Sequence, residues 1–265
     1  MLNELCLPSF RRALLAGCLL LGLSAAAAPA AAALSAEIDV EALLRDADRA
    51  RGGDLPGLNW TIAIDAHEEV GGSDGGGRDD HQEMIAQAHG KKTRVDFVAP
   101  ARIKGQSVLM LSRNMWFMKP GLQKPVPISP RQRLLGQAAN GDIAATDYAG
   151  DYAARADGEE VIDGERCVVL ELTSREKNTT YDRIRYWVSL ARKVGLKAEF
   201  YTVSGKHFKT ATFVYGNRIE HDGRQIAMVS RMTIHDALQP ANVTTMSYTD
   251  VSVRRVDAAV FQLNP

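Results

Sequence analysis

The chain has 265 residues, of which 45% are hydrophobic and 24% are charged, and its 32 basic and 32 acidic side chains give a net charge of zero. Proteins that bind nucleic acids usually carry a strong basic excess, so no nucleic-acid partner is expected. About 230 residues remain after the leader described next, and that length is enough for one large β domain with a buried core.

Residues 1–33 have the three parts of a secretory signal peptide. Arg11 and Arg12 supply positive charge, the stretch from Ala13 to Ala25 is apolar, and the alanine-rich stretch up to residue 36 offers cleavage sites of the A-x-A type. An apolar stretch of about 13 residues is too short to span a bilayer, and no later segment is long and apolar enough to do so. We therefore expect cleavage between residues 33 and 36 and a soluble mature chain in the periplasm.

The cysteines leave one alternative open. Leu15-Ala16-Gly17-Cys18 resembles a lipobox, which would make Cys18 a lipidated first residue, but the apolar stretch before it is short. Cleavage at an alanine site removes Cys6 and Cys18, so Cys167 is then the single cysteine and no intramolecular disulfide can form. Cys167 lies in an apolar segment, which predicts a buried and inert thiol.

The first part of the mature chain predicts one helix followed by strands. The helix is expected over Ile38–Arg51, because apolar residues recur along one face and Gly52-Gly53 follows. Residues 71–77 are mostly glycine and are expected to form a loop. Strand-like patterns cover Asn59–Ile64, Glu83–Ala99 and Ser107–Met118.

Four prolines interrupt the strand pattern between residues 120 and 130. Proline cannot donate a hydrogen bond to a neighbouring strand, so the sheet is expected to break here. Ser129 and Pro130 suit the N-cap and first position of a short helix over Arg131–Ala139. We interpret residues 119–153 as a cover laid over an edge or mouth of the sheet, with Leu134 and Leu135 as its apolar lid contacts.

From residue 160 onwards the chain predicts strands joined by tight turns. Asp163-Gly164 and Asp222-Gly223 are typical of two-residue hairpin turns, and further turns are expected at 191–192 and 204–205. The predicted strands span residues 160–162, 166–172, 181–188, 194–201, 206–215, 225–235 and 242–253. With about ten strands at this spacing, the fold class is mainly β, of the barrel or sandwich type.

Most of these strands alternate between apolar and charged residues. Because every second side chain of a strand points to the same side of a sheet, each apolar set should share one face. We predict that this face is concave and binds lipid, with a lining of Trp116, Met118, Leu170, Ile184, Tyr186, Leu196, Phe200, Met228 and Met232. The alternative for each of these residues is that it fills an ordinary core.

Patterns of catalytic or metal sites are missing from the sequence. It contains neither the nucleophile elbow G-x-S-x-G nor the zinc motif H-E-x-x-H. His67, His81 and His89 lie around the glycine-rich loop with Asp79 and Asp80, but their spacing has no order that favours a metal, and they are interpreted as solvated loop residues. We therefore expect no metal, no cofactor and no enzymatic activity.

Three short motifs follow one another between residues 97 and 133. They are F-x-x-P-x-x-x-K-G from Phe97, W-x-x-x-P from Trp116 and I-S-x-x-x-R from Ile128. In order and spacing they resemble the LolA-like family of outer-membrane lipoprotein-sorting proteins, and residues 184–189, 196–206 and 251–261 also look like that family. One departure is the stretch 123–127, which has a single basic residue where relatives often have several arginines.

The resemblance implies an incomplete, strongly curved antiparallel β-barrel with few helices, in which helices form a lid over an apolar concave face. It implies one lipid-carrier domain over residues 34–265. Members of the family are thought to carry acyl chains of lipoproteins or other lipids across the periplasm, from an inner-membrane transporter to an outer-membrane acceptor. We expect such a carrier here, acting as a monomer, with the cargo open among lipoprotein, phospholipid, hopanoid-like lipid and glycolipid.

Two other functions are compatible with the same sequence. A structural or sensor module of the periplasm would have the same strands, but its own lid would fill the apolar face. A lipid hydrolase would need a nucleophile beside a histidine, and no such pair stands out.

Overall fold

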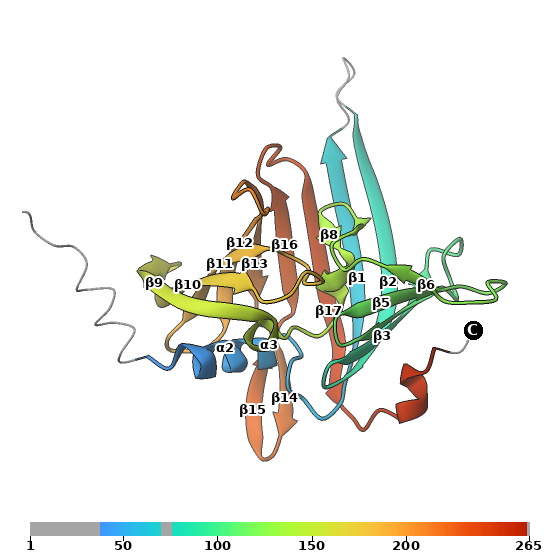
Figure 1. Cartoon of the computed structure of the whole chain (residues 1–265), viewed down its shortest axis with the longest axis horizontal. Coiled ribbons are helices and arrows are strands. Elements are labelled where there is room, and N and C mark those ends of the chain that lie inside the picture. The colour runs from blue at the N-terminus through green and yellow to red at the C-terminus, as the bar shows by residue number, and fades with distance from the viewer. Residues whose placement is uncertain (1–37, 70–75, 264–265) are drawn as a thin grey trace, which may run out of the picture.

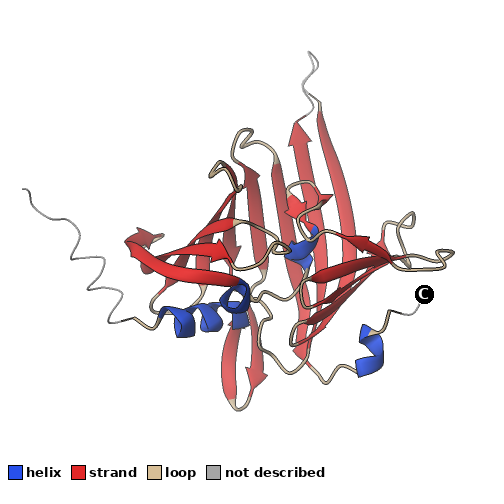
Figure 2. Cartoon of the chain, in the orientation of Figure 1, coloured by secondary structure: helices blue, strands red, loops and turns tan. Residues whose placement is uncertain are grey.

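A long, curved antiparallel sheet dominates the computed structural model, which describes residues 38–69 and 76–263 (Figures 1 and 2). The sheet has 13 strands in the order β6-β5-β4-β3-β2-β1-β17-β16-β13-β12-β11-β10-β9. Within the described part of the chain its two edges, β6 and β9, do not pair with each other, so the barrel stays open. The predicted mainly β fold with an incomplete barrel is confirmed, whereas the predicted signal peptide and the lipobox at Cys18 lie outside the described residues.

The last strand in the sequence, β17, pairs with β1 and so joins the two halves of the sheet. The first half contains β1 (Leu58–Glu69), β2 (Gly77–His89), β3 (Lys92–Ala99), β4 (Ser107–Leu111), β5 (Asn114–Met118) and β6 (Val126–Ile128). The second contains β9 (Tyr152–Ile162), β10 (Glu165–Ser174), β11 (Arg183–Ser189), β12 (Gly195–Tyr201), β13 (His207–Val214), β16 (Arg231–Asp236) and β17 (Val243–Val253). Two small hairpins lie outside this sheet: β7 (Arg133–Leu135) with β8 (Ala138–Ala139), and β14 (Asn217–His221) with β15 (Arg224–Met228).

Tight turns account for both the successes and the errors of strand prediction. The hairpin turns at Asp163-Gly164 and Asp222-Gly223 are confirmed, and all four residues have positive φ angles. The predicted strands 83–99 and 107–118 are wrong as single strands, because each is a hairpin with its own two-residue turn. The predicted strand 225–235 is likewise two strands, because the chain leaves the β14–β15 hairpin before it joins the main sheet as β16.

The helices are short and lie apart from one another: α2 is at the lower left of Figure 2, and the last helical turn, near the C-terminus, is at the lower right. The predicted first helix is confirmed as α2 (Val40–Arg49), which begins where the Asp39 side chain accepts a hydrogen bond from the amide of Ala42. The others are single turns: η1 (Asn140–Ile143), α3 (Tyr148–Asp151) and η2 (Ala258–Phe261). Among the described residues, none of the helices has the length and hydropathy needed to cross a bilayer.

The motif that starts at Phe97 forms the turn between β3 and β4. The amide of Gly105 donates to the carbonyl of Phe97 (3.1 Å) with a φ of 83°, a conformation that glycine adopts at little cost. A Cβ on Gly105 would come within 3.5 Å of the Pro120 ring, so the second motif packs directly against the first. These motif residues therefore shape the frame of the sheet.

Buried side chains form one large and two small clusters. The large cluster fills the concave side and includes residues of α2, of the cover and of strands from both halves of the sheet. The small clusters lie on the outer face: Trp187 and Val169 pack with Cys167, and Leu109 packs under η2 with Phe261. Cys167 is a free, buried cysteine, as predicted, and burial raises the pKa of its thiol.

Candidate functional site

The cover, residues 119–153, crosses the concave face of the sheet (Figure 1). The predicted helix over Arg131–Ala139 is wrong, since this segment forms the hairpin β7–β8. Its turn contains Gly136 at a φ of 52°, so close to the sheet that a Cβ would clash with Thr244 and Ala66. The hairpin is thus shaped by its contact with β1 and β17, and its leucines, Leu134 and Leu135, pack half-buried against the large cluster.

A buried lysine of the sheet fixes the tip of this hairpin. Lys209 of β13 is 3% exposed, and its ammonium donates to the carbonyl of Gln137 at 2.8 Å. The same ammonium lies 3.4 Å from the carboxylate of Asp142 in η1 and 4.6 Å from the centre of the Tyr181 ring. Burial lowers the pKa of Lys209, and the Asp142 carboxylate opposes that effect. On the other side of the tip, the amide of Gln137 donates to Thr244 Oγ1 at 2.7 Å.

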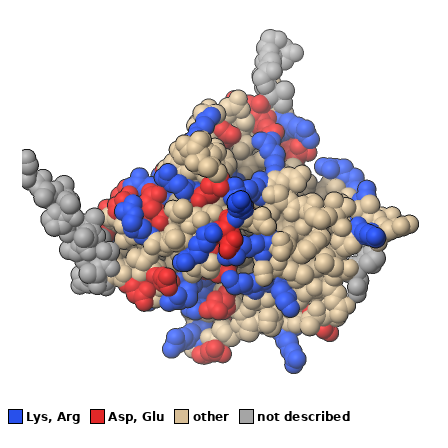
Figure 3. All heavy atoms as spheres, in the orientation of Figure 1, with Lys and Arg blue, Asp and Glu red and all other residues tan. Residues whose placement is uncertain are grey.

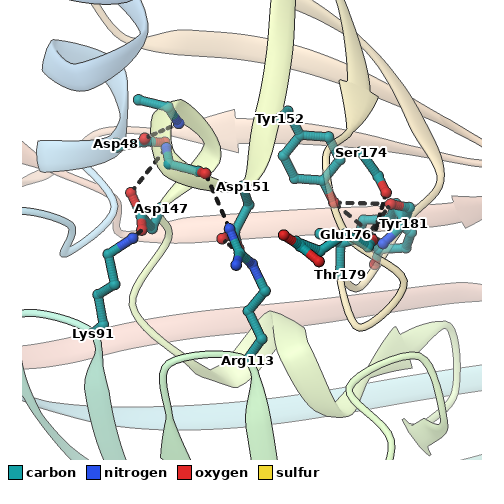
Figure 4. A network of polar contacts seen from close by, with 12 residues as sticks. Asp48, Lys91, Arg113, Asp147, Asp151, Tyr152, Ser174, Glu176, Thr179 and Tyr181 are labelled. Atoms are coloured by element: carbon teal, nitrogen blue, oxygen red, sulfur yellow. Dashed lines mark hydrogen bonds and ion pairs between the residues drawn. The ribbon is translucent and has the colours of Figure 1, made fainter.

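Polar contacts also fix the end of the cover around α3 (Figure 4). Lys91, in the β2–β3 turn, pairs with Asp147 at 2.6 Å, and Arg113, in the β4–β5 turn, pairs with Asp151 at 2.8 Å. The amide of Ala149 donates to the Asp48 carboxylate of α2 at 2.8 Å. Two turns of the sheet and one helix therefore hold α3 in place.

Two charged side chains lie buried beneath α3. Asp48 and Arg51 are 3% and 8% exposed, and the Arg51 guanidinium lies 4.6 Å from the centre of the Phe213 ring. Burial raises the pKa of Asp48 to about 7, although the hydrogen bonds from the cover and the charge of Arg51 oppose it. Within the described residues Asp48 Oδ1 and Arg51 Nη1 have no hydrogen-bond partner. Isolated polar groups of this kind are costly inside a protein.

Six of the nine predicted lining residues meet in the large cluster beneath the cover. They are Leu170, Ile184, Tyr186, Phe200, Met228 and Met232, each at most 2% exposed. The other three, Trp116, Met118 and Leu196, do not lie in this cluster.

A β-bulge moves Leu196 to the outer face. Trp187 pairs with Lys197 and Val188 pairs with Gly195, so Leu196 is the extra residue on β12. A bulge of this kind breaks the alternation of side chains. Leu196 consequently packs with Trp187 on the outer side, while Ala198 and Phe200 stay on the concave side.

In β5 the side chains of the odd-numbered residues face the concave side of the sheet. Met115 and Phe117 contact the large cluster, whereas Met118 packs on the outer face beneath η2 and Trp116 shares its side. Both faces of β5 are apolar, so alternation alone does not decide which face is concave. The sequence analysis also missed Lys209, although a lysine two residues before Ala211 and four before Phe213, on the same strand face, is a detectable irregularity.

The histidines near the glycine-rich loop form cross-strand pairs on β1 and β2. His67 lies 2.8 Å from Asp79, and His81 lies 2.7 Å from Asp65, a hydrogen bond that raises the pKa of His81. All four side chains are exposed on a hairpin. Among the described residues, no group of three or more His, Cys, Asp or Glu side chains has the arrangement of a metal site.

The gaps found between described residues beneath the cover are small. Two gaps of about 20 and 40 Å³ lie beside Arg51, one near Trp60 and Tyr248 and the other near Tyr148 and Tyr181. By this measure a single water molecule needs about 10–15 Å³, so the two gaps have room for a few water molecules and not for an acyl chain. This conformation is closed, and a chain of hydrocarbon could reach the concave face only if the cover moved.

Comparison with known proteins agrees with this architecture. A family model described as "Uncharacterized protein" matches residues 89–264, and no curated protein matches the chain. A crystal structure of a LolA superfamily protein from Nitrosomonas europaea is 30% identical, covers 85% of this chain and 98% of its own, and superposes with a TM-score of 0.73.

Two more distant structures have the same fold. One, from Vibrio parahaemolyticus, is described as an outer membrane lipoprotein-sorting protein domain (18% identity, 83% of this chain and 95% of that chain, TM-score 0.66). The other is a DUF1329 family protein from Desulfovibrio piger (21% identity, 84% and 97%, TM-score 0.64). Since the identity to the Nitrosomonas protein extends over nearly all of that chain, the present protein belongs to the LolA superfamily.

Proposed function

We propose that the protein is a non-catalytic periplasmic carrier that holds the acyl chains of lipoproteins or other lipids on its concave face and moves them toward the outer membrane. One observation carries the proposal: apolar side chains from five strands meet beneath a cover whose central hairpin pairs only with itself and is held to the sheet by polar contacts. The proposed lining is Leu170, Ile184, Tyr186, Phe200, Met228 and Met232, with Leu134 and Leu135 as lid contacts.

The energetics of an acyl chain suit a device that closes over an apolar face. Removing hydrocarbon from water yields about 0.8 kcal/mol per methylene, so a dozen methylenes offer about 10 kcal/mol. Binding that strong would hinder release. A cover that must open first lowers the apparent affinity by the fraction of open molecules, and closure can then help to expel the cargo.

Five methionines lie buried on the concave face. Met84, Met115, Met228, Met232 and Met246 all lie in the large cluster, each at most 2% exposed. The thioether side chain is flexible and polarisable, so it adapts to apolar partners of irregular shape. Such a lining suits acyl chains of different length better than one rigid ligand.

The first test is the lipid content of protein purified from its own periplasm. Native mass spectrometry and lipid extraction should find acyl lipids bound to the mature chain. Protein that is free of lipid, and that also fails to bind a fluorescent fatty acid in titration, would exclude the carrier.

The small size of the gaps beneath the cover favours a second candidate, a structural or sensor module that fills its own barrel. Hydrogen exchange separates the two functions. In a carrier the amide of Gln137, bound to Thr244 when the cover is closed, should exchange through opening of the cover alone, well before global unfolding. In a module it should exchange only when the whole protein unfolds.

The same proposal includes the cellular setting. After cleavage of the signal peptide, residues 34–265 would act as one domain and as a monomer in the periplasm. The partners would be an inner-membrane transporter that supplies the cargo and an outer-membrane acceptor that receives it. Coexpression and crosslinking of the mature chain in the periplasm would detect both.

A further inference from the structure

A groove of about 460 Å³ opens where the cover hairpin meets the ends of β12 and β13. One wall is the hairpin, with Arg133 and Gln137, and the opposite wall carries Tyr201, Lys206 and Phe208. Its inner lining includes Lys209, the residue that fixes the hairpin tip. The groove therefore follows the seam along which the cover would separate from the sheet.

Two β-turns at the outer edge of this groove present apolar side chains to solvent. Val203, in the β12–β13 turn, is 82% exposed, and Leu238, in the β16–β17 turn, is 69% exposed. Within the described residues they are the two most exposed large hydrophobic side chains. The turns are neighbours, because β13 pairs with β16 and the amide of Ala237 donates to the carbonyl of Phe208 at 3.0 Å. Both lie at the upper edge of the sheet in Figure 1.

Hydrogen bonds within each turn hold these side chains outward. The amides of Leu238 and Gln239 donate to the Asp236 carboxylate at 2.7 and 3.0 Å. In the other turn the amide of Thr202 donates to the carbonyl of Lys206 at 3.0 Å, and the amide of Lys206 donates back to the Thr202 hydroxyl at 3.2 Å. Exposed apolar side chains that lie together, rather than singly, mark surfaces that meet an apolar partner.

The charges beside the two turns favour an anionic partner. Four basic and two acidic residues line the groove: Arg131, Arg133, Lys206, Lys209, Asp182 and Asp236. Glu68 and Asp142, outside the lining, neutralise Arg133 and Lys209, so Lys206 is the basic residue that stays available to a partner. Three of the basic residues pair with a carboxylate, whereas in the described part of the chain Lys206 has none. Figure 3 shows many basic side chains, with acidic ones among them, near the middle of this face, where the cover crosses the sheet. Basic residues beside exposed apolar ones are typical of attachment to anionic lipid surfaces.

We propose that this edge is the membrane-docking mouth of the protein: Val203 and Leu238 insert into an anionic bilayer surface, Lys206 contacts its phosphates, and the groove between them receives the lipid. The inference rests on the proposed carrier function, since the cargo of a lipid carrier must leave and enter a bilayer. It adds the route by which lipid enters and leaves the protein and the kind of membrane surface at which this happens. Docking at the seam would place the acyl chains beside the hairpin that has to move.

The test is binding of the mature full-length chain to phosphatidylcholine vesicles with and without phosphatidylglycerol. Val203→Asp/Leu238→Asp removes the apolar contacts and Lys206→Glu reverses the charge. Val161→Asp is the matched control, because Val161 is 65% exposed on the edge strand β9, three strands away from β12. All four positions are exposed, so unchanged thermal unfolding should verify that the variants fold.

The parent should bind the vesicles that contain phosphatidylglycerol, and less at high salt. The double variant should lower vesicle partitioning at least about tenfold, Lys206→Glu should lower it at least about fivefold, and Val161→Asp should behave as the parent. Failure of the parent to bind, binding of the double variant at the parent's level, or an equal loss in Val161→Asp would overturn the inference.

A second arm separates this inference from the proposed function. A fluorescent fatty acid is added from solution without vesicles, and the double variant should bind it as the parent does. A parent that binds the fatty acid but not the vesicles overturns the docking mouth alone. A parent that binds neither overturns the carrier function as well.

Discussion

Replacing Thr244 by valine should open the cover with little change in the shape of the sheet. Thr244, the second residue of β17, is fully buried beneath the cover hairpin, and its hydroxyl accepts the hydrogen bond from the amide of Gln137 at 2.7 Å. Valine fills a similar volume but cannot accept that bond. The amide then has no acceptor while the cover is closed, whereas it reaches water when the cover opens.

The size of the effect follows from the cost of leaving this part-buried amide unpaired. That cost is about 1–3 kcal/mol, so the ratio of closed to open molecules should fall about 5- to 150-fold. A ligand that binds only open molecules gains apparent affinity in proportion to the open fraction. Thr244→Val should therefore bind an acyl chain more tightly than the parent, by up to the same factor while the open form stays a minority.

Titration with a fluorescent fatty acid measures this gain, and urea denaturation measures the accompanying loss of stability. Thr245→Val is the matched control, because Thr245 is the next residue of β17 but points to the opposite face, away from the cover. An unchanged affinity for the fatty acid in Thr244→Val, together with the expected loss of stability, would refute the idea that the cover controls access.

Three further results are expected. Lys209→Met leaves the Asp142 carboxylate buried without its cation, so the free energy of unfolding in urea should fall by about 3–5 kcal/mol. Met232→Ala and Leu196→Ala should each cost about 2–5 kcal/mol, but only Met232→Ala, on the concave face, should change fatty-acid binding in titration. The pKa of Asp48 is about 7 in the folded protein against an ordinary value of 3.8, so the folded state holds this proton more tightly and stability falls as the pH rises from about 4 to about 7. The side chain introduced by Asp48→Asn stays neutral at every pH. The free energy of unfolding of this variant, relative to that of the parent, should therefore be higher at about pH 8 than at about pH 4 in denaturation curves.

The parts of the fold that local sequence determines were predictable. Alternation of apolar and charged residues identified most strands of the second half, because a strand buried on one face repeats every two residues. Asp163-Gly164 and Asp222-Gly223 identified two turns, because these residue types tolerate the positive φ angles that such turns require. The turn at Ser112-Arg113 escaped because it lacks that signal, although Ser112 has a φ of 57°.

Long-range contacts determined what the sequence could not show. Ser129 and Pro130 favour the start of a helix, yet the segment after them is a hairpin whose amide and carbonyl at Gln137 bond to Thr244 and Lys209, 107 and 72 residues later in the chain. No local pattern reports such partners. The bulge at Leu196 is similar, because a single extra residue changes the face of one side chain without changing the apolar pattern around it.

The concave face therefore carries two kinds of side chain with separate roles in the proposed carrier. The aliphatic, methionine and aromatic side chains set the affinity for hydrocarbon, which grows with the apolar area they offer. The polar groups among them, Thr244 and Lys209 in the sheet and Asp48 in α2, hold the cover and so set the fraction of closed molecules. Because the two roles lie on different residues, substitutions at the polar positions can adjust release while the surface that receives the cargo stays the same.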